Sequence, residues 1–107
     1  MQRKLIFILS AMLLASVSPA MAGQITLVNG THLAVLAVQA KSHGTIAWGR
    51  DLLDDNTLGI GKSRRVALPV GVSCDADFLA TLDDGHKLVI LADNVCRNSA
   101  VAVTDNR

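Results

Sequence analysis

Apolar and polar residues of this chain form short runs that alternate with turn residues. Apolar and β-branched residues gather in the ranges 24–28, 33–39, 46–48, 63–68, 75–82, 87–91 and 101–104. Glycine, proline, asparagine, aspartate and serine separate these runs, and such residues end strands and build turns. Short runs at this spacing are typical of β-sandwiches. The pattern predicts an all-β fold, a small antiparallel β-sandwich of six or seven strands.

Two stretches of the pattern allow more than one structure. The run 33–39 is nearly all apolar, so its periodicity does not separate a buried strand from a buried helix. Its valines and the turn residues on both sides favour a central strand. The stretch 49–62 has the composition of a loop, and one turn of helix capped by Asp51 is compatible with residues 51–53.

The first 22 residues have the three parts of a secretory signal. Arg3 and Lys4 precede the apolar run 5–17, and Ala20-Met21-Ala22 follows as a cleavage site. A membrane anchor is the alternative, but an apolar run of about 13 residues is shorter than the ~20 that a spanning helix needs. We therefore expect a cleaved helical signal peptide over 1–22, a single domain over 23–107, and a periplasmic or secreted location.

Cleavage changes the composition of the working protein. The chain has ten lysines and arginines and nine acids. Two of the basic residues leave with the signal, so the expected mature part has a formal charge of −1. This near-neutral balance does not favour nucleic acid as a partner. A local basic patch at Lys62, Arg64 and Arg65 is conceivable, but residues of this kind more often form a solvated strand face. We expect no contact with membrane after cleavage.

The two cysteines flank a hairpin signal. Asp84-Gly85 stands between two strand-like runs, and such a turn needs the positive φ that glycine adopts without steric cost. Cys74 and Cys96 each lie 11 positions from Gly85, nearly opposite each other in an antiparallel hairpin. Export exposes both thiols to an oxidising compartment. We predict a structural disulfide, because a redox-active pair would need a Cys-x-x-Cys spacing that is missing here.

Several short motifs occur in a fixed order along the chain. They are Asn29-x-Thr31, Trp48-Gly49-x-Asp51-Leu52-Leu53, Leu58 with Gly61, Cys74-x-x-Asp77, Asp84-Gly85 and Cys96. Over nearly all of residues 24–96, this order resembles a group of small secreted bacterial β-rich proteins of unknown function. The resemblance implies one β-rich domain after a signal peptide, with no activity to carry over. Ala76 departs from the group, whose members have a larger apolar or aromatic residue before the aspartate.

The Trp-Gly-x-Asp-Leu-Leu segment is the candidate interaction loop. Trp48 can fill one end of the sandwich, and Asp51 can accept backbone N–H groups and close the loop. Leu52 and Leu53 are predicted to enter the core. A loop that only covers the sandwich end is the alternative to a binding site. The residues proposed for interaction are Trp48, Arg50, Asp51 and Leu52.

Metal and catalytic chemistry are weakly represented in the sequence. His32, His43 and His86 fall in three separate turns, without the spacing of a local metal site. The chain contains no glutamate, so the closing ligand of a calcium loop is missing. No serine has a nucleophile-elbow context, and a domain of about 85 residues is expected to leave little room for a pocket. We therefore expect no catalytic residues, no metal site and no cofactor.

The sequence leaves two function classes open. The first is a non-enzymatic module that contacts another exported protein through the loop 48–58 or an exposed sheet edge. The alternative is a small-ligand or metal-ion binding protein that uses His43, His86 and the aspartate-rich turns.

Overall fold

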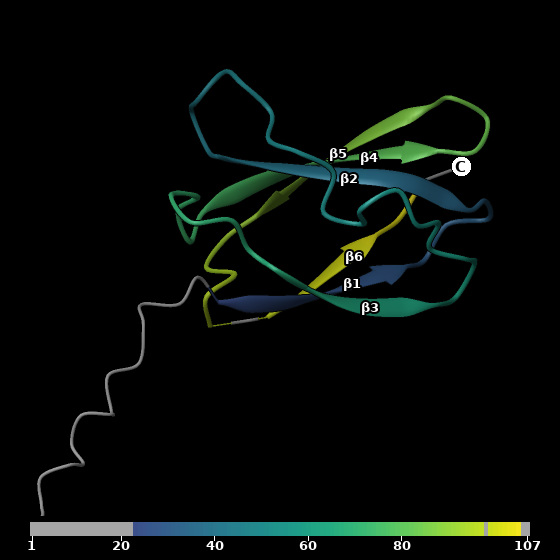
Figure 1. The fold of residues 1–107 in the computed structure, drawn as a ribbon, viewed down its shortest axis with the longest axis horizontal. Helices are drawn as coiled ribbons and strands as arrows, with labels where there is room; N and C mark the ends of the chain where they lie inside the picture. The colour runs from purple at the N-terminus through teal and green to yellow at the C-terminus, as the bar shows by residue number, and fades with distance from the viewer. Residues whose placement is uncertain (1–22, 98, 106–107) are drawn as a thin grey trace, which may run out of the picture.

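The computed structural model describes residues 23–97 and 99–105, which form two packed β-sheets (Figure 1). The predicted signal segment 1–22 lies outside the described residues. The strands are β1 (Gln24–Asn29), β2 (Val35–Ser42), β3 (Ser63–Ala67), β4 (Ala76–Leu82), β5 (Lys87–Ala92) and β6 (Ala100–Val103). The prediction of an all-β sandwich is confirmed, with six strands. In the described part of the chain, no helix has the length and apolar character needed to cross a membrane.

The two sheets have three strands each, and their order differs from the chain order. One sheet has the order β3-β1-β6 and the other β2-β4-β5. All pairs are antiparallel except β1 and β6, which run parallel. Parallel neighbours need a long crossover, and here nearly the whole domain lies between the two strands. The last strand thus returns to the first and pairs with the side of β1 that β3 leaves open.

The core lies between the two layers and is made by alternating positions of the strands. Ile25 and Leu27 of β1 face Phe78 and Leu82 of β4, all at most 1% exposed. Leu53 enters the same core from the loop after β2, also fully buried. Burial of such side chains is the main stabilising contribution in a domain of this size.

A β-bulge explains why the apolar run 33–39 shows no clear face. The pairing of β2 with β4 shifts register between Val35 and Ala37, so Leu36 is an extra residue. Val35 and Val38 are both fully buried, although three positions separate them, and Leu36 between them is 39% exposed. The prediction of a strand for this run is confirmed. The bulge turns both valines inward, which explains why the run shows no regular alternation.

One local prediction was wrong, and one open alternative is excluded by the backbone geometry. Residues 46–48 form no strand, and Ile46 is 92% exposed, so this short run has no layer to pack against. Residues 52–55 form hydrogen-bonded turns and not a helix, with Asp54 and Asp55 at positive φ of 53° and 64°. Left-handed residues in succession are incompatible with a continuing right-handed helix.

The buried side chain of Asn29 joins three segments at one end of the sandwich. Its amide nitrogen donates to the carbonyl oxygens of Leu33 at 2.9 Å and Leu58 at 3.0 Å. Its Oδ1 accepts from the backbone N–H and the hydroxyl of Thr31, at 2.9 and 2.8 Å. Both residues are buried, and buried polar groups need such partners. The Asn-x-Thr motif therefore fixes how β1 ends and how β2 begins.

The cysteine pair closes the other end of the β4–β5 hairpin. Gly85 has the positive φ expected in the turn, at 89°. Cys74 and Cys96 form a disulfide with a Cα–Cα distance of 5.2 Å. The ladder pairs Ala76 with Ala92, and its simple continuation would place Cys74 opposite Asn94. Instead the chain turns after β5, with Asn94 at φ 56°, and brings Cys96 to Cys74. The predicted bond is confirmed, with a turn that absorbs two residues.

Replacement of both cysteines by alanine should destabilise the domain. A bond between residues 22 positions apart restricts the unfolded chain, and its loss costs about 3 kcal/mol in the chain-entropy model. Urea unfolding followed by circular dichroism measures this change. A reducing agent should lower the stability of the wild type to that of the double variant and leave the variant unchanged. Equal stability of oxidised wild type and variant would contradict the structural role.

Candidate functional site

The candidate interaction loop runs along the outer edge of β2. The N–H of Gly49 donates to the Ala40 carbonyl at 3.0 Å, and the N–H of Leu52 donates to the Val38 carbonyl at 2.6 Å. Farther along, Val35 and Leu58 exchange two backbone hydrogen bonds, at 2.9 and 3.0 Å. The loop thus satisfies backbone groups that an edge strand would otherwise expose.

Asp51 closes this loop with three backbone hydrogen bonds. Its Oδ1 accepts from the N–H groups of Val38 at 3.0 Å and Leu53 at 2.9 Å, and its Oδ2 accepts from Asp55 at 3.0 Å. Burial alone would raise the pKa of Asp51, but these three hydrogen bonds outweigh it and lower the pKa below the ordinary value. Asp51 therefore acts as an ionised anchor, as the sequence predicted.

The neighbours of Asp51 divide between core and surface. Leu52 and Leu53 are 4% and 0% exposed, so the prediction that they enter the core is confirmed. Trp48 is only partly buried and is not a member of the buried core. It lies instead beside Lys41, whose Nζ is 5.0 Å from the ring centroid. This cation–π contact holds the indole on the outside of β2, because the chain passes along the edge of the sheet and not over its end.

A buried carboxylate lies close to the Trp48 contact. Asp77 of β4 is directly opposite Lys41 of β2 in the register. Its Oδ2 accepts from Lys41 Nζ at 2.9 Å, its Oδ1 lies 3.0 Å from Nδ1 of His43, and only 8% of its side chain is exposed. The hydrogen bonds from Lys41 and then His43 outweigh burial and lower the pKa of Asp77. Lys41 Nζ also donates to the Thr45 carbonyl at 2.7 Å, which ties the following loop to the cluster.

An open groove of about 540 Å³ lies beside this cluster. One wall is the end of β2 with the loop after it, and the other is the turn Pro69–Val72. The hydroxyl of Ser42 joins the walls, because it accepts from the N–H of Ser73 at 2.8 Å and donates to the Gly71 carbonyl at 3.3 Å. The groove exceeds the size expected for a small domain because it lies on the surface, outside the core. Its lining residues are Ala40, Lys41, Ser42, Thr45, Ala47, Gly49, Arg50, Pro69, Val70, Gly71 and Val72.

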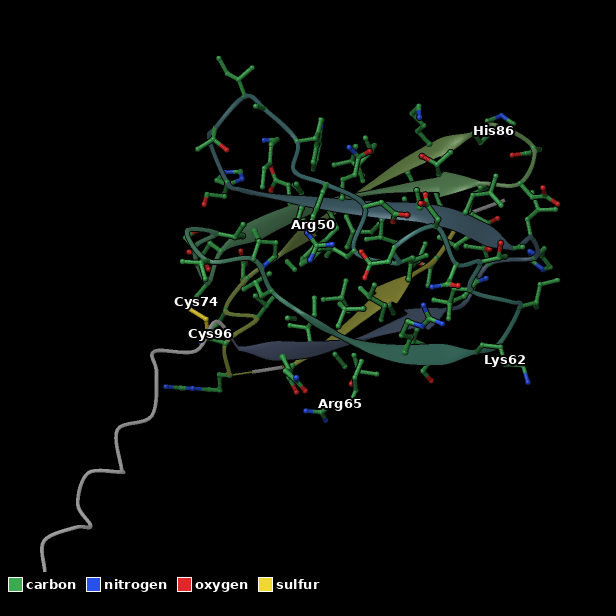
Figure 2. The ribbon with its side chains drawn as sticks, in the orientation of Figure 1. Arg50, Lys62, Arg65, Cys74, His86 and Cys96 are labelled. Carbon is green, nitrogen blue, oxygen red and sulfur yellow. A yellow bond between two sulfur atoms is a disulfide. The ribbon has the colours of Figure 1, made fainter. Side chains whose placement is uncertain are left out.

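The conceivable basic patch is divided by the strand geometry. Arg64 and Arg65 are neighbours on β3 and point to opposite faces. The Arg64 guanidinium donates to the Leu53 carbonyl at 3.3 Å, whereas Arg65 donates to Oε1 of Gln24 at 3.0 and 3.2 Å. Figure 2 shows Arg50 beside β2, apart from Lys62, which precedes β3, and from Arg65 within β3. Arg64 and Arg65 therefore contribute to different faces of β3.

Each histidine lies beside a different aspartate. His43 is near Asp77, and Nδ1 of His86 is 2.7 Å from Oδ2 of Asp84 in the hairpin turn. Nδ1 of His32 is 3.5 Å from an oxygen of Asp105. His86 lies at the end of the sandwich opposite to the disulfide (Figure 2). Within residues 23–97 and 99–105, no three histidine, cysteine or acidic side chains gather as a metal site would require.

Sequence reasoning missed two parts of this site. Asp77 occupies an outward position of β4, where alternation predicts exposure, and nothing local indicates that Lys41 and His43 enclose it. The turn Pro69–Val72 follows the predicted strand 63–68, and nothing in its local sequence indicates that it forms a wall of the groove. The one available signal is the spacing of Lys41 and His43, because side chains two positions apart share a face of an extended segment. His43 itself lies just after the end of β2.

Asp51→Ala should loosen the loop, because three backbone N–H groups lose their acceptor at once. Loss of such side-chain caps costs about 1–2 kcal/mol. Asp51→Asn keeps one acceptor oxygen and should cost less. Thermal unfolding and amide hydrogen exchange at Val38 and Leu53 measure the effect. If the two variants were equally stable, the anchoring role of the carboxylate would be wrong.

Asp77→Asn should alter the pH dependence of stability. Because the folded pKa of Asp77 lies below its ordinary value of 3.8, the ionised group stabilises the fold above that value. The contribution is lost as the pH falls through the folded pKa. The variant should be less stable at pH 7 and lose less stability between about pH 5 and 3. Urea midpoints over this range test it, with the exposed Asp83→Asn as the control for loss of one charge. Parallel curves for Asp77→Asn and wild type would argue against the cluster.

Comparison with known proteins gives no further guide to this site. The chain matched no protein-family model, no curated protein and no solved structure.

Proposed function

We propose that this chain is an exported, non-enzymatic module that binds an extended segment of another exported protein in the groove beside Trp48. The observation that carries the proposal is the groove itself, with walls from the end of β2 and from the turn Pro69–Val72. Clefts of this kind are the usual place for peptide and ligand recognition. The loop predicted from sequence to interact, with Trp48, Arg50, Asp51 and Leu52, borders or supports this groove.

The export part of the proposal rests on two features. The first 22 residues have the pattern of a cleaved signal, and the Cys74–Cys96 bond is consistent with an oxidising compartment. Resemblance to small secreted bacterial proteins with a Trp-Gly-x-Asp-Leu-Leu loop supports the same location. A periplasmic or secreted protein is accordingly the proposed form.

The lining of the groove indicates what kind of segment it takes. Ala47, Val70 and Val72 supply apolar surface, and Lys41 and Arg50 are the two cations of a lining that contains no acid. Val70 is 89% exposed, and Ile46, which lies between two lining residues, is 92% exposed. The best fit is an extended segment with apolar side chains and one carboxylate.

Arg50 is the residue best placed to receive that carboxylate. Its guanidinium is 2.7 Å from Oδ1 of Asp54, but both side chains are more than 60% exposed. An exposed ion pair of this kind contributes little stability. Exchange of Asp54 for a carboxylate of the partner therefore costs little, and the planar guanidinium can hold it through two hydrogen bonds.

The cysteines and the two anchored aspartates support a binding function and not a catalytic one. Cys74 and Cys96 are bonded to each other, so neither offers a thiolate. Asp51 and Asp77 both have a lowered pKa and are held by several donors. A general acid or base works best with a pKa near the working pH, and these two carboxylates are shifted the other way.

A displayed library of random linear peptides should yield ligands for the groove. Peptides selected on the wild type should share apolar residues and a carboxylate, and calorimetry should give a measurable affinity. Val70→Asp places a negative charge in the groove and should weaken these peptides at least about tenfold, or 1.4 kcal/mol. Arg50→Gln should weaken those peptides that contain the carboxylate.

Arg65→Gln is the matched control, because it removes an exposed arginine from the other sheet. It should leave peptide affinity unchanged. The proposal would be wrong if no peptide family were enriched, or if the selected peptides bound Val70→Asp as tightly as wild type.

A further inference from the structure

The outer edge of β5 presents backbone groups that no strand of the chain pairs. β5 ends the sheet order β2-β4-β5. The N–H of Leu82 donates to the His86 carbonyl, so these two residues form a hydrogen-bonded pair of the β4–β5 ladder. In an antiparallel ladder, hydrogen-bonded pairs recur at every second residue. Leu88 and Ile90 therefore bond to β4. Lys87, Val89 and Leu91 direct their N–H and C=O groups away from β4, toward the open side.

The other edge of the same sheet is treated differently. The loop from Gly49 to Leu58 donates to and accepts from the backbone of β2. Along β5, no backbone hydrogen bond to another described segment replaces that cover. β6 of the opposite sheet comes near β5 without bonding to it. One edge of the sheet is covered by the chain itself and the other is open.

The open edge carries apolar side chains in water. Val89 and Leu91 are 58% and 66% exposed on the outer face of β5. Natural edge strands usually avoid such a surface through charges, proline or bulges. β5 has one charge, Lys87, and no proline, and its ladder with β4 is regular. An apolar, regular and unpaired edge is a template for a further strand.

We propose that the occupant of this edge is β5 of a second copy, paired antiparallel about a two-fold axis at Ile90. In this register Lys87 of each copy lies opposite Asp93 of the other, and Val89 lies opposite Leu91 of the other. The outward backbone groups of Val89 and Leu91 then bond in pairs. The two sheets join into one sheet of six strands.

The self-complementarity of the segment favours a second copy over an unrelated strand. Asp93 follows β5 directly and is exposed, so each interface contains two lysine–aspartate pairs by symmetry. On the inner face the two copies of Ile90 meet, and Leu88 lies opposite Ala92, all partly buried residues packed against the core. An axis at Val89 would place Lys87 opposite Leu91 and lose both charge pairs. Cross-strand pairs of this kind determine register.

The proposal does not depend on the groove. The groove borders β2 and the turn Pro69–Val72, whereas β5 is the opposite edge of the sheet. Failure of peptide binding would leave the dimer intact, and a monomeric protein would leave the groove available. The two conclusions are therefore tested separately.

Sedimentation equilibrium tests the dimer with protein purified from cells that express the full chain. The wild type should show a reversible monomer–dimer equilibrium. Lys87→Asp places like charges opposite each other twice and should raise the dimer dissociation constant about tenfold or more. Asp93→Lys should do the same. Arg65→Asp, on the outer face of the other sheet, is the control and should leave the constant unchanged.

Two combinations make the test specific to the register. An equimolar mixture of Lys87→Asp and Asp93→Lys should form a heterodimer with wild-type affinity, because both charge pairs become complementary. The double variant should dimerise with itself for the same reason. Val89→Pro removes an outward N–H without loss of a β4 hydrogen bond, and it should abolish dimerisation while circular dichroism stays that of the wild type.

The proposal is overturned if the wild type is monomeric up to about 1 mM, a concentration that detects even weak association. A dimer that is unaffected by Lys87→Asp and by Asp93→Lys would also overturn it. If Val89→Pro failed to fold, the mixture of the two charge variants would decide between the outcomes.

Discussion

Backbone hydrogen bonding at the sheet edges is the constraint on which this structure depends most. Each of the two sheets has three strands, so four of the six strands are edge strands. Every edge strand has backbone N–H and C=O groups that must be paired or hydrated. The edge of β2 is paired by the loop after it, and Asp51 holds that loop in place. The course of this loop sets the position of Trp48 and one wall of the groove.

Buried polar side chains determine how the loops leave the sandwich. Asn29 bonds to the ends of several segments, and Asp77 gathers Lys41 and His43 at the end of β2. Burial of such groups is costly without partners, so each admits few arrangements of the surrounding chain. They give specificity to a small core, and the disulfide adds stability by restricting the unfolded chain.

The two edges of the β2-β4-β5 sheet support two different kinds of recognition. Beside the covered edge, a surface groove combines apolar lining with Lys41 and Arg50, which suits an extended segment with a carboxylate. The open edge of β5 offers backbone groups and the apolar side chains of Val89 and Leu91, which suits a strand.

The sequence by itself determined the features that depend on near neighbours. The positions of the six strands, the turn at Gly85, the cysteine pair around it and the buried Leu52 and Leu53 were predicted from local pattern, whereas the strand expected at 46–48 is absent. Such features follow from residue periodicity and turn chemistry, which act over a few positions.

Only the tertiary structure decided the rest. The parallel pairing of β1 with β6, the bulge at Leu36 and the wall formed by Pro69–Val72 depend on segments that are distant in the chain. Lys41 and Asp77 are 36 residues apart, and their contact exists because β2 and β4 pair in one particular register. That register results from the fit of the whole core. A shift of the pairing by one residue would turn every side chain of the strand to the other face of the sheet.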